Sequence, residues 1–204
     1  MKLPLQCEAQ YIQAFLSDKD EQTLFDWLNR HCDLDKPEAI TLANGEQVEI
    51  LPWKMMFVEP RLVDADIFPQ CHGRRQAWPP VIESIQQQLQ QKSGIEFDVC
   101  VCIYYPNGEE YMDFHSDLPA FGPTDVIASL SIGAERTFQI RREQNHEEQL
   151  TLTLESGSLL IMGKGFQALY QHAVPRAPET LSARFNLTFR QFNWPNHTNK
   201  NECR

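Results

Sequence analysis

The sequence lacks any long apolar run, and this argues against a membrane-spanning helix. Such a helix needs about 20 consecutive apolar residues, whereas polar and charged residues interrupt every apolar stretch of this 204-residue chain. The N-terminus also lacks the continuous apolar core of a secretory signal. We therefore expect a soluble protein of the cytoplasm.

The cysteines show no pairing pattern. The six cysteines include no C-x-x-C pair, and a chain of this size does not need disulfides to be stable. Reduced thiols are therefore expected. Cys100 and Cys102 alternate along an apparent strand, so we interpret them as packing residues and predict no zinc site from them.

Positive charge is also scarce: 18 Lys and Arg oppose 28 Asp and Glu, for a net charge of -10. Nonspecific binding to a phosphate backbone comes mainly from Lys and Arg, which displace counterions. The charge balance therefore does not predict an extended nucleic-acid groove. Local basic patches remain open at Arg74-Arg75, Arg141-Arg142 and Lys164, although scattered surface charge is the commoner explanation.

The first third of the chain reads as helical and irregular. A helix is predicted over 18–31, where a capping-box-like sequence precedes apolar residues with helical spacing. A second helix is predicted to begin at Pro79-Pro80 and to end before Gly94. The pattern over 33–78 predicts no particular element.

Short β-type runs replace the helical pattern from residue 97 onward. They cover 97–105, 126–133, 136–141, 149–154, 158–163 and 183–190. Several short strands without intervening helices indicate an antiparallel sandwich or barrel, and a jelly roll is one solution at this size.

Three residues in this β-rich region form a candidate metal site. His115 and Asp117 are two positions apart, which places both side chains on one side of an extended chain. His172 would supply a third ligand from another strand. Two imidazoles and a carboxylate make the facial triad that leaves open positions on non-haem iron(II). Zinc is the rival metal, because the same ligand set also describes catalytic zinc sites.

The segment 184–190 separates polar from apolar side chains. Alternate positions put Phe185, Leu187 and Phe189 on one face and the polar residues on the other, namely Arg184, Asn186, Thr188 and Arg190. A polar row in a central strand suggests that it lines a cavity. Guanidinium groups bind carboxylates through paired, charged hydrogen bonds, so the two arginines could bracket a small dicarboxylate. The alternative is that they pair with Asp or Glu on neighbouring strands.

Taken together and in this order, the motifs resemble the AlkB-like iron(II)- and 2-oxoglutarate-dependent dioxygenases, which remove alkyl groups from nucleobases by oxidation. The likeness covers roughly residues 55 to 192. It is carried by H-S-D at 115–117, I-A-S-L-S-I-G-A-E-R-T-F at 127–138, L-E-S-G-S-L-L-I-M at 154–162, Q-H-A-V-P-R at 171–176 and R-F-N-L-T-F-R at 184–190. The last block is the most specific of these.

The resemblance implies a role for seven residues. Iron(II) would be held by His115, Asp117 and His172. The co-substrate 2-oxoglutarate, used together with O2, would contact Tyr105, Arg184, Asn186 and Arg190.

The resemblance also implies the fold and its division. The fold class is mainly β with flanking helices, a double-stranded β-helix (jelly-roll, cupin-like) core with N-terminal helices packed outside. Within one structural domain, 1–96 would be a helical and irregular extension with a substrate-lid region, 97–192 the dioxygenase core and 193–204 a polar tail. A monomer is expected.

The likeness weakens where a substrate would bind. The family's repair enzymes usually carry Asn where this chain has Ile103, and acidic residues where it has Leu118-Pro119. Our leading hypothesis is oxidative demethylation of N-alkylated bases in DNA or RNA, a DNA-repair activity. Two alternatives stay open: a dioxygenase that acts on a protein or small molecule, and a non-catalytic jelly-roll binding module.

Overall fold

A computed structural model describes residues 1–41, 45, 47–50, 53–65, 74–119, 122–180 and 182–193. The polar tail expected over 193–204 lies outside these residues except for its first position, as do Cys71 and Cys203. No helix in the described ranges is both long and apolar enough to cross a membrane.

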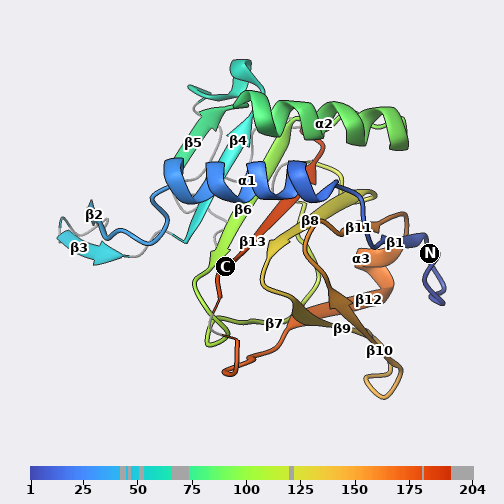
Figure 1. Cartoon of the computed structure of the whole chain (residues 1–204). Coiled ribbons are helices and arrows are strands. Elements are labelled where there is room, and N and C mark those ends of the chain that lie inside the picture. The colour runs from blue at the N-terminus through green and yellow to red at the C-terminus, as the bar shows by residue number, and fades with distance from the viewer. Residues whose placement is uncertain are drawn as a thin grey trace.

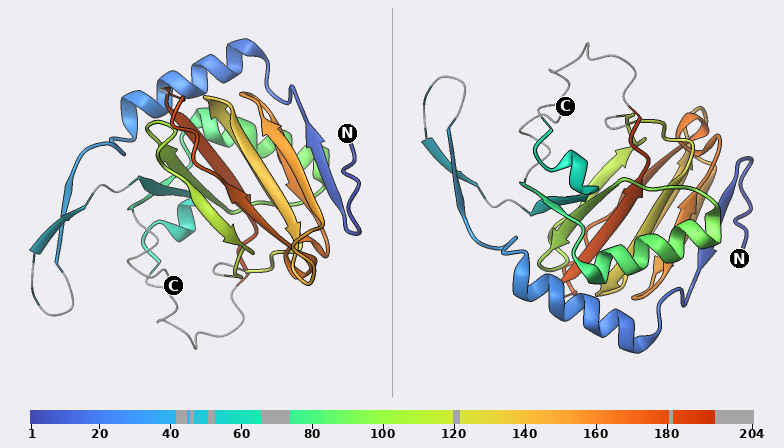
Figure 2. Two further views of the ribbon diagram at one scale, coloured as in Figure 1. Left: turned by 90° about the horizontal axis from the view of Figure 1, so that it is seen from below. Right: turned by 90° about the horizontal axis from the view of Figure 1, so that it is seen from above.

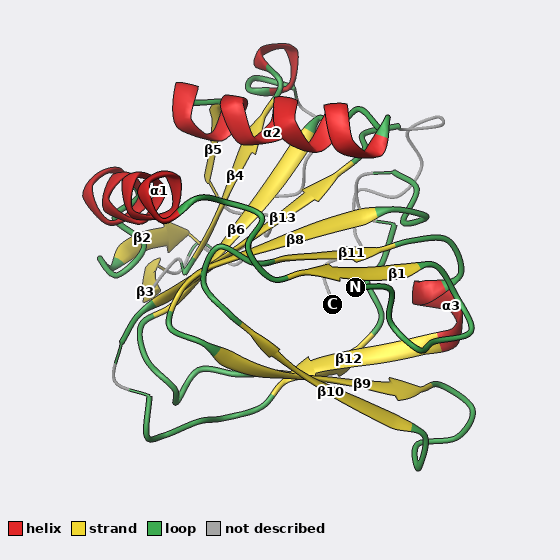
Figure 3. Cartoon of the chain, turned by 45° about the vertical axis from the view of Figure 1, so that its right-hand side comes forward, coloured by secondary structure: helices red, strands yellow, loops and turns green. Residues whose placement is uncertain are grey.

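Seven strands form the larger of two facing sheets (Figure 3). Their spatial order is β1 (Ala9–Ile12), β11 (Leu159–Met162), β8 (Ile127–Gly133), β13 (Arg184–Arg190), β6 (Val99–Tyr105), β4 (Lys54–Val58) and β5 (Arg74–Ala77). Neighbouring strands are antiparallel except for the parallel pair β4 and β5. Strand β13 is therefore central, between β8 and β6.

Four antiparallel strands form the smaller sheet, which faces the larger one. Their order is β10 (Gln149–Leu154), β9 (Arg136–Arg142), β12 (Tyr170–Val174) and β7 (Met112–His115). The two sheets make a jelly-roll-like sandwich, and this confirms the predicted β-helix core. A separate hairpin, β2 (Glu38–Thr41) and β3 (Gln47–Ile50), extends away from the sandwich (Figure 1).

Both predicted long helices are confirmed. Helix α1 spans Asp18–His31, and the Ser17 hydroxyl caps it by accepting a hydrogen bond from the backbone N–H of Asp20. Helix α2 spans Pro80–Ser93 and ends at Gly94, whose left-handed φ of 71° suits a residue without a Cβ. Both helices lie across the outer face of the larger sheet (Figure 2).

The side-chain alternation predicted for β13 is also confirmed. Phe185, Leu187 and Phe189 belong to the core between the larger sheet and the helices, and burying each contributes about 1.5–3 kcal/mol. Asn186 and Thr188 face the smaller sheet instead, where they line a cavity. The helices thus bury one face of β13 and leave its polar face for the interior of the sandwich.

Several elements were not predicted from the sequence: β1, β4, β5, the β2–β3 hairpin, the short helix η1 (Pro60–Leu62) and the one-turn helix α3 (Phe166–Leu169). Strand β4 shows no alternation because both its faces are buried: Met55 and Phe57 pack under the helices, whereas Met56 and Val58 join a different cluster. The larger sheet therefore runs across the boundary expected at residue 96, since β1, β4 and β5 precede it.

Candidate metal and co-substrate site

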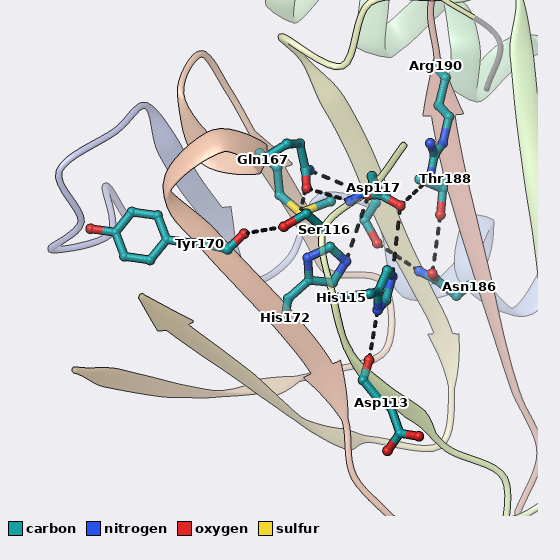
Figure 4. A network of polar contacts seen from close by, with 12 residues as sticks. Asp113, His115, Ser116, Asp117, Gln167, Tyr170, His172, Asn186, Thr188 and Arg190 are labelled. Carbon is teal, nitrogen blue, oxygen red and sulfur yellow. Dashed lines mark hydrogen bonds and ion pairs between the residues drawn. The ribbon is translucent and has the colours of Figure 1, made fainter. Parts of the chain in front are cut away.

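The structure brings the three predicted metal ligands together between the sheets. His115 ends β7, Asp117 lies two residues further on, and His172 lies in β12 directly opposite His115 in the strand register. One candidate ligand atom from each residue lies within 4.8 Å of the others. Figure 4 shows the two imidazole rings and the carboxylate turned toward a common point.

A backbone contact sets the orientation of His115. Its Nδ1 lies 2.8 Å from the carbonyl oxygen of Asp113. Because a carbonyl oxygen only accepts, Nδ1 donates this hydrogen bond, and Nε2 is the ring nitrogen left to act as a ligand atom. That Nε2 faces Oδ1 of Asp117 at 3.9 Å. His115 therefore presents a ligand atom to the site.

Burial keeps His172 neutral. The residue is 6% exposed, and burial lowers the pKa of its imidazole from 6.5 to about 4. Its ring stacks on Phe138 at 5.4 Å between centroids, and its Nε2 lies 3.8 Å from Oδ2 of Asp117. Within the described part of the chain, Nδ1 of His172 has no hydrogen-bond partner, so ring packing rather than a polar contact holds this side chain.

Asp117 carries the negative charge of the site. Burial acts to raise the pKa of its carboxyl group, but Arg190, His172 and His115 together bring the pKa below its ordinary value. The strongest partner is Arg190, whose Nη2 donates to Oδ1 at 2.6 Å. The candidate ligand atoms of two imidazoles and a carboxylate thus converge on one point. They repel one another unless a cation lies between them, so the donor set fits a divalent metal.

A second part of the site has the opposite character. The Arg184 side chain is 1% exposed, and its guanidinium carbon lies 5.0 Å from the ring centroid of Tyr105. Its Nη2 donates to Oγ of Ser131 at 3.1 Å, whereas Nε and Nη1 have no partner among the described residues. Burial lowers the pKa of this guanidinium. A buried cation with unused donors fits an anion, and a carboxylate has the matching geometry.

The two arginines therefore differ: each fits a different one of the two alternatives that the sequence left open. Arg190 pairs with a carboxylate, as the plainer alternative expected, but that carboxylate is Asp117, a member of the triad. For Arg184 the described residues supply no Asp or Glu partner, which leaves it available for a bound dicarboxylate.

One cavity joins the triad to most of the predicted co-substrate residues. It is lined by Ile103, Tyr105, Met112, His115, Asp117, Ser129, Phe138, Met162, His172, Val174, Asn186, Thr188 and Arg190. Arg184 is not among the lining residues, but its guanidinium lies over the ring of Tyr105, which is. The amide of Asn186 is already used within the protein, since its Nδ2 donates to Oγ of Ser129 at 2.8 Å. Leu118 stands where the family's repair enzymes carry acidic residues, and it is 58% exposed.

Sequence reasoning missed two polar residues near the site. Arg136 is 2% exposed and donates to three backbone carbonyl oxygens, which ties the loops before β7 and after β12 together. It lies inside a block that carried the family resemblance, and that was the available signal. Gln167 contacts Asp117 from α3, and only the tertiary structure brings these two residues together.

A comparison with protein families decides the classification. Residues 8–190 match the model of the 2OG-Fe(II) oxygenase superfamily. The chain belongs to this superfamily. Membership specifies iron(II) with 2-oxoglutarate and O2 as co-substrates, and this confirms the cofactors expected from the sequence.

Curated relatives confirm the AlkB-like resemblance. The chain is 38% identical over 122 residues to human alpha-ketoglutarate-dependent dioxygenase alkB homolog 3, a match that covers 55% of this chain and 43% of the relative. It is 27% identical over 206 residues to the DNA oxidative demethylase ALKBH2 of Arabidopsis thaliana, covering 88% of this chain and 65% of the relative.

The solved structure titled "The structure of OsALKBH1" matches with a TM-score of 0.60 at 20% identity, covering 93% of this chain and 100% of that one. At this identity the likeness supports the fold alone. The chain spans less than half the length of its alkB homolog 3 relatives, since the human match covers 43% of that protein.

Proposed function

We propose that this protein is an AlkB-like dioxygenase that demethylates N-alkylated nucleobases in DNA or RNA. The observation that carries the dioxygenase chemistry is the convergence of three ligand atoms, from His115, Asp117 and His172, within 4.8 Å. The nucleobase substrate is supported by the names of relatives, among them a DNA oxidative demethylase.

Each polar residue then has a distinct task. Iron(II), when bound, supplies the oxidation of an alkyl C–H bond by O2 at the expense of 2-oxoglutarate. Arg190 neutralises Asp117 through Oδ1 and leaves Oδ2 directed toward the imidazole of His172. Arg190 would meet the 2-oxoglutarate carboxylate nearer the metal, and Arg184 with Tyr105 would hold the distant one. The apolar cavity residues, including Ile103 and Met162, exclude water from the reaction.

A second candidate keeps the cofactors and changes the substrate to a protein side chain or small molecule. It is favoured by Leu118, which directly follows Asp117 and is 58% exposed, and by the net charge of -10. An exposed apolar side chain and a negative protein are poorly suited to a phosphate backbone.

The deciding experiment measures succinate and formaldehyde after O2 is admitted to anaerobically iron-loaded protein. Parallel reactions contain no substrate, unmodified oligonucleotides, or oligonucleotides with N-methylated adenine or cytosine. Asp117→Asn should lose turnover, and Asp113→Asn is its matched control, because the side chain of Asp113 is exposed on the same segment.

Three outcomes separate the hypotheses. Formaldehyde released in step with succinate, and only with methylated oligonucleotides, supports the nucleobase demethylase. Turnover of 2-oxoglutarate that no oligonucleotide stimulates supports the second candidate. Failure to bind iron(II) and 2-oxoglutarate together would contradict both and favour the binding module.

A further inference from the structure

Gln167 connects the segment that carries His115 and Asp117 to helix α3, which directly precedes the strand that carries His172. Gln167 lies in α3, 50 residues after Asp117. Its amide oxygen Oε1 accepts a hydrogen bond from the backbone N–H of Asp117 at 2.9 Å. Figure 4 shows the Gln167 amide beside both the backbone and the carboxylate of Asp117.

The other end of the same amide faces the carboxylate. Nε2 of Gln167 lies 3.5 Å from Oδ2 of Asp117, a long contact, and 3.7 Å from Sδ of Met162. Because Arg190 binds Oδ1, each carboxylate oxygen has one protein N–H group beside it. Oδ2 is also the oxygen that faces His172, at 3.8 Å. Gln167 therefore restrains both the backbone and the side-chain rotation of Asp117.

The packing of α3 makes Gln167 a firm support. The adjacent Phe166 is fully buried, and its ring centroid lies 5.9 Å from that of Tyr170 and 6.0 Å from that of His172. Helix α3 thus packs against His172 through Phe166 and hydrogen-bonds to Asp117 through Gln167. A movement of α3 would change the position of His172 relative to Asp117.

We infer that Gln167 is a positioning residue that sets the orientation of the Asp117 carboxylate toward the two imidazoles. This inference rests on the proposed metal site. A nearby contact provides a comparison: Ser116 Oγ donates to the carbonyl oxygen of Tyr170 at 3.0 Å. It ties the same segment to the same part of the chain without touching the carboxylate.

The test is a titration of the metal-free 204-residue chain with Co(II). The visible absorption of the bound Co(II) reports the ligand geometry. Gln167→Met keeps the length of the side chain and removes both amide contacts. It should weaken Co(II) binding about 10-fold or more and alter the absorption bands. Ser116→Ala should stay within about threefold of the wild type. Thermal unfolding of the metal-free variants reports any general loss of stability.

The outcomes are distinguishable. Wild-type binding and absorption in Gln167→Met would overturn the inference, as would an equal loss in Gln167→Met and Ser116→Ala, since the role would then be structural only. If Gln167→Met does not fold, Gln167→Ala takes its place under the same criteria. The proposed metal site fails separately, if the wild type binds no Co(II) or if Asp117→Asn binds it as well as the wild type does.

Discussion

The two parts of the candidate site treat buried charge in opposite ways. Near the triad, Asp117 and Arg190 form a bond of 2.6 Å that links a loop beside the smaller sheet to the centre of the larger one. Around Arg184 the described residues offer a hydroxyl and an aromatic ring but no carboxylate. The triad end is thus compensated within the protein, whereas the Arg184 end carries an uncompensated cation.

This difference indicates the charge of the ligand that each end of the site can bind. Desolvating an unpaired charge costs several kcal/mol, which the rest of the fold must offset. Such a cost is retained where a ligand supplies the missing partner, so Arg184 fits a co-substrate that arrives with its own negative charge. At the other end Arg190 already balances Asp117, and the remaining lone pairs suit a cation.

The largest effect should come from breaking the triad end. His115→Ala removes a ligand atom that the Asp113 carbonyl orients, and turnover of 2-oxoglutarate should fall by more than about 100-fold, beyond what loss of a supporting contact alone costs. His146→Ala, at an exposed turn, is the control and should keep full turnover. Full turnover in His115→Ala would show that this residue does not bind the metal.

Breaking the other end should act on co-substrate binding. Arg184→Ala removes charged hydrogen bonds to a carboxylate, which contribute about 1.5–3 kcal/mol each, so the KM for 2-oxoglutarate should rise at least about 10-fold. Arg176→Ala is the control, because its side chain is 59% exposed and contacts the surface residues Glu109, at 4.0 Å, and Tyr111 rather than the cavity. Initial rates at varied 2-oxoglutarate concentration measure both. Equal effects would remove the reason for distinguishing Arg184.

The stability of the metal-free protein should depend on pH through His172. The pKa of His172 is about 4 in the folded protein, against the ordinary value of 6.5 that applies to the unfolded chain. Between pH 4 and 6.5 the unfolded chain therefore binds a proton that the folded protein does not. Stability should therefore fall as the pH drops from 6.5 to 4, by up to about 3 kcal/mol. Chemical denaturation across this range, compared with His172→Gln, tests the assignment, and an unchanged slope in the variant would contradict it.

A substitution that removes the Arg184 charge but keeps the side-chain length tests the contrast most directly. Arg184→Met replaces a buried cation that has unused donors by an apolar side chain of similar length. The ligand-free protein should become more stable by about 1–3 kcal/mol, although 2-oxoglutarate should bind at least about 10-fold more weakly. Denaturation with and without 2-oxoglutarate measures both quantities. Destabilisation of the ligand-free protein would mean that Arg184 is compensated without the co-substrate.

The sequence alone was enough to predict the features that depend on local patterns. Helices α1 and α2 were predicted with their ends because capping residues and apolar spacing act within a few turns. The alternation in β13 was predicted because a strand has a period of two. The two-residue spacing of His115 and Asp117 indicated a pair of metal ligands, and with the family resemblance it indicated His172 as the third.

Only the tertiary structure decided what depends on contacts between distant segments. Strand β4 has no readable period because both its faces are buried. Arg184 and Arg190 look equivalent in their shared motif, yet a folded neighbour supplies a carboxylate to one and not to the other among the described residues. Gln167 likewise meets Asp117 across 50 residues. Such pairings follow from how the sheets and α3 pack together, and no local pattern encodes them.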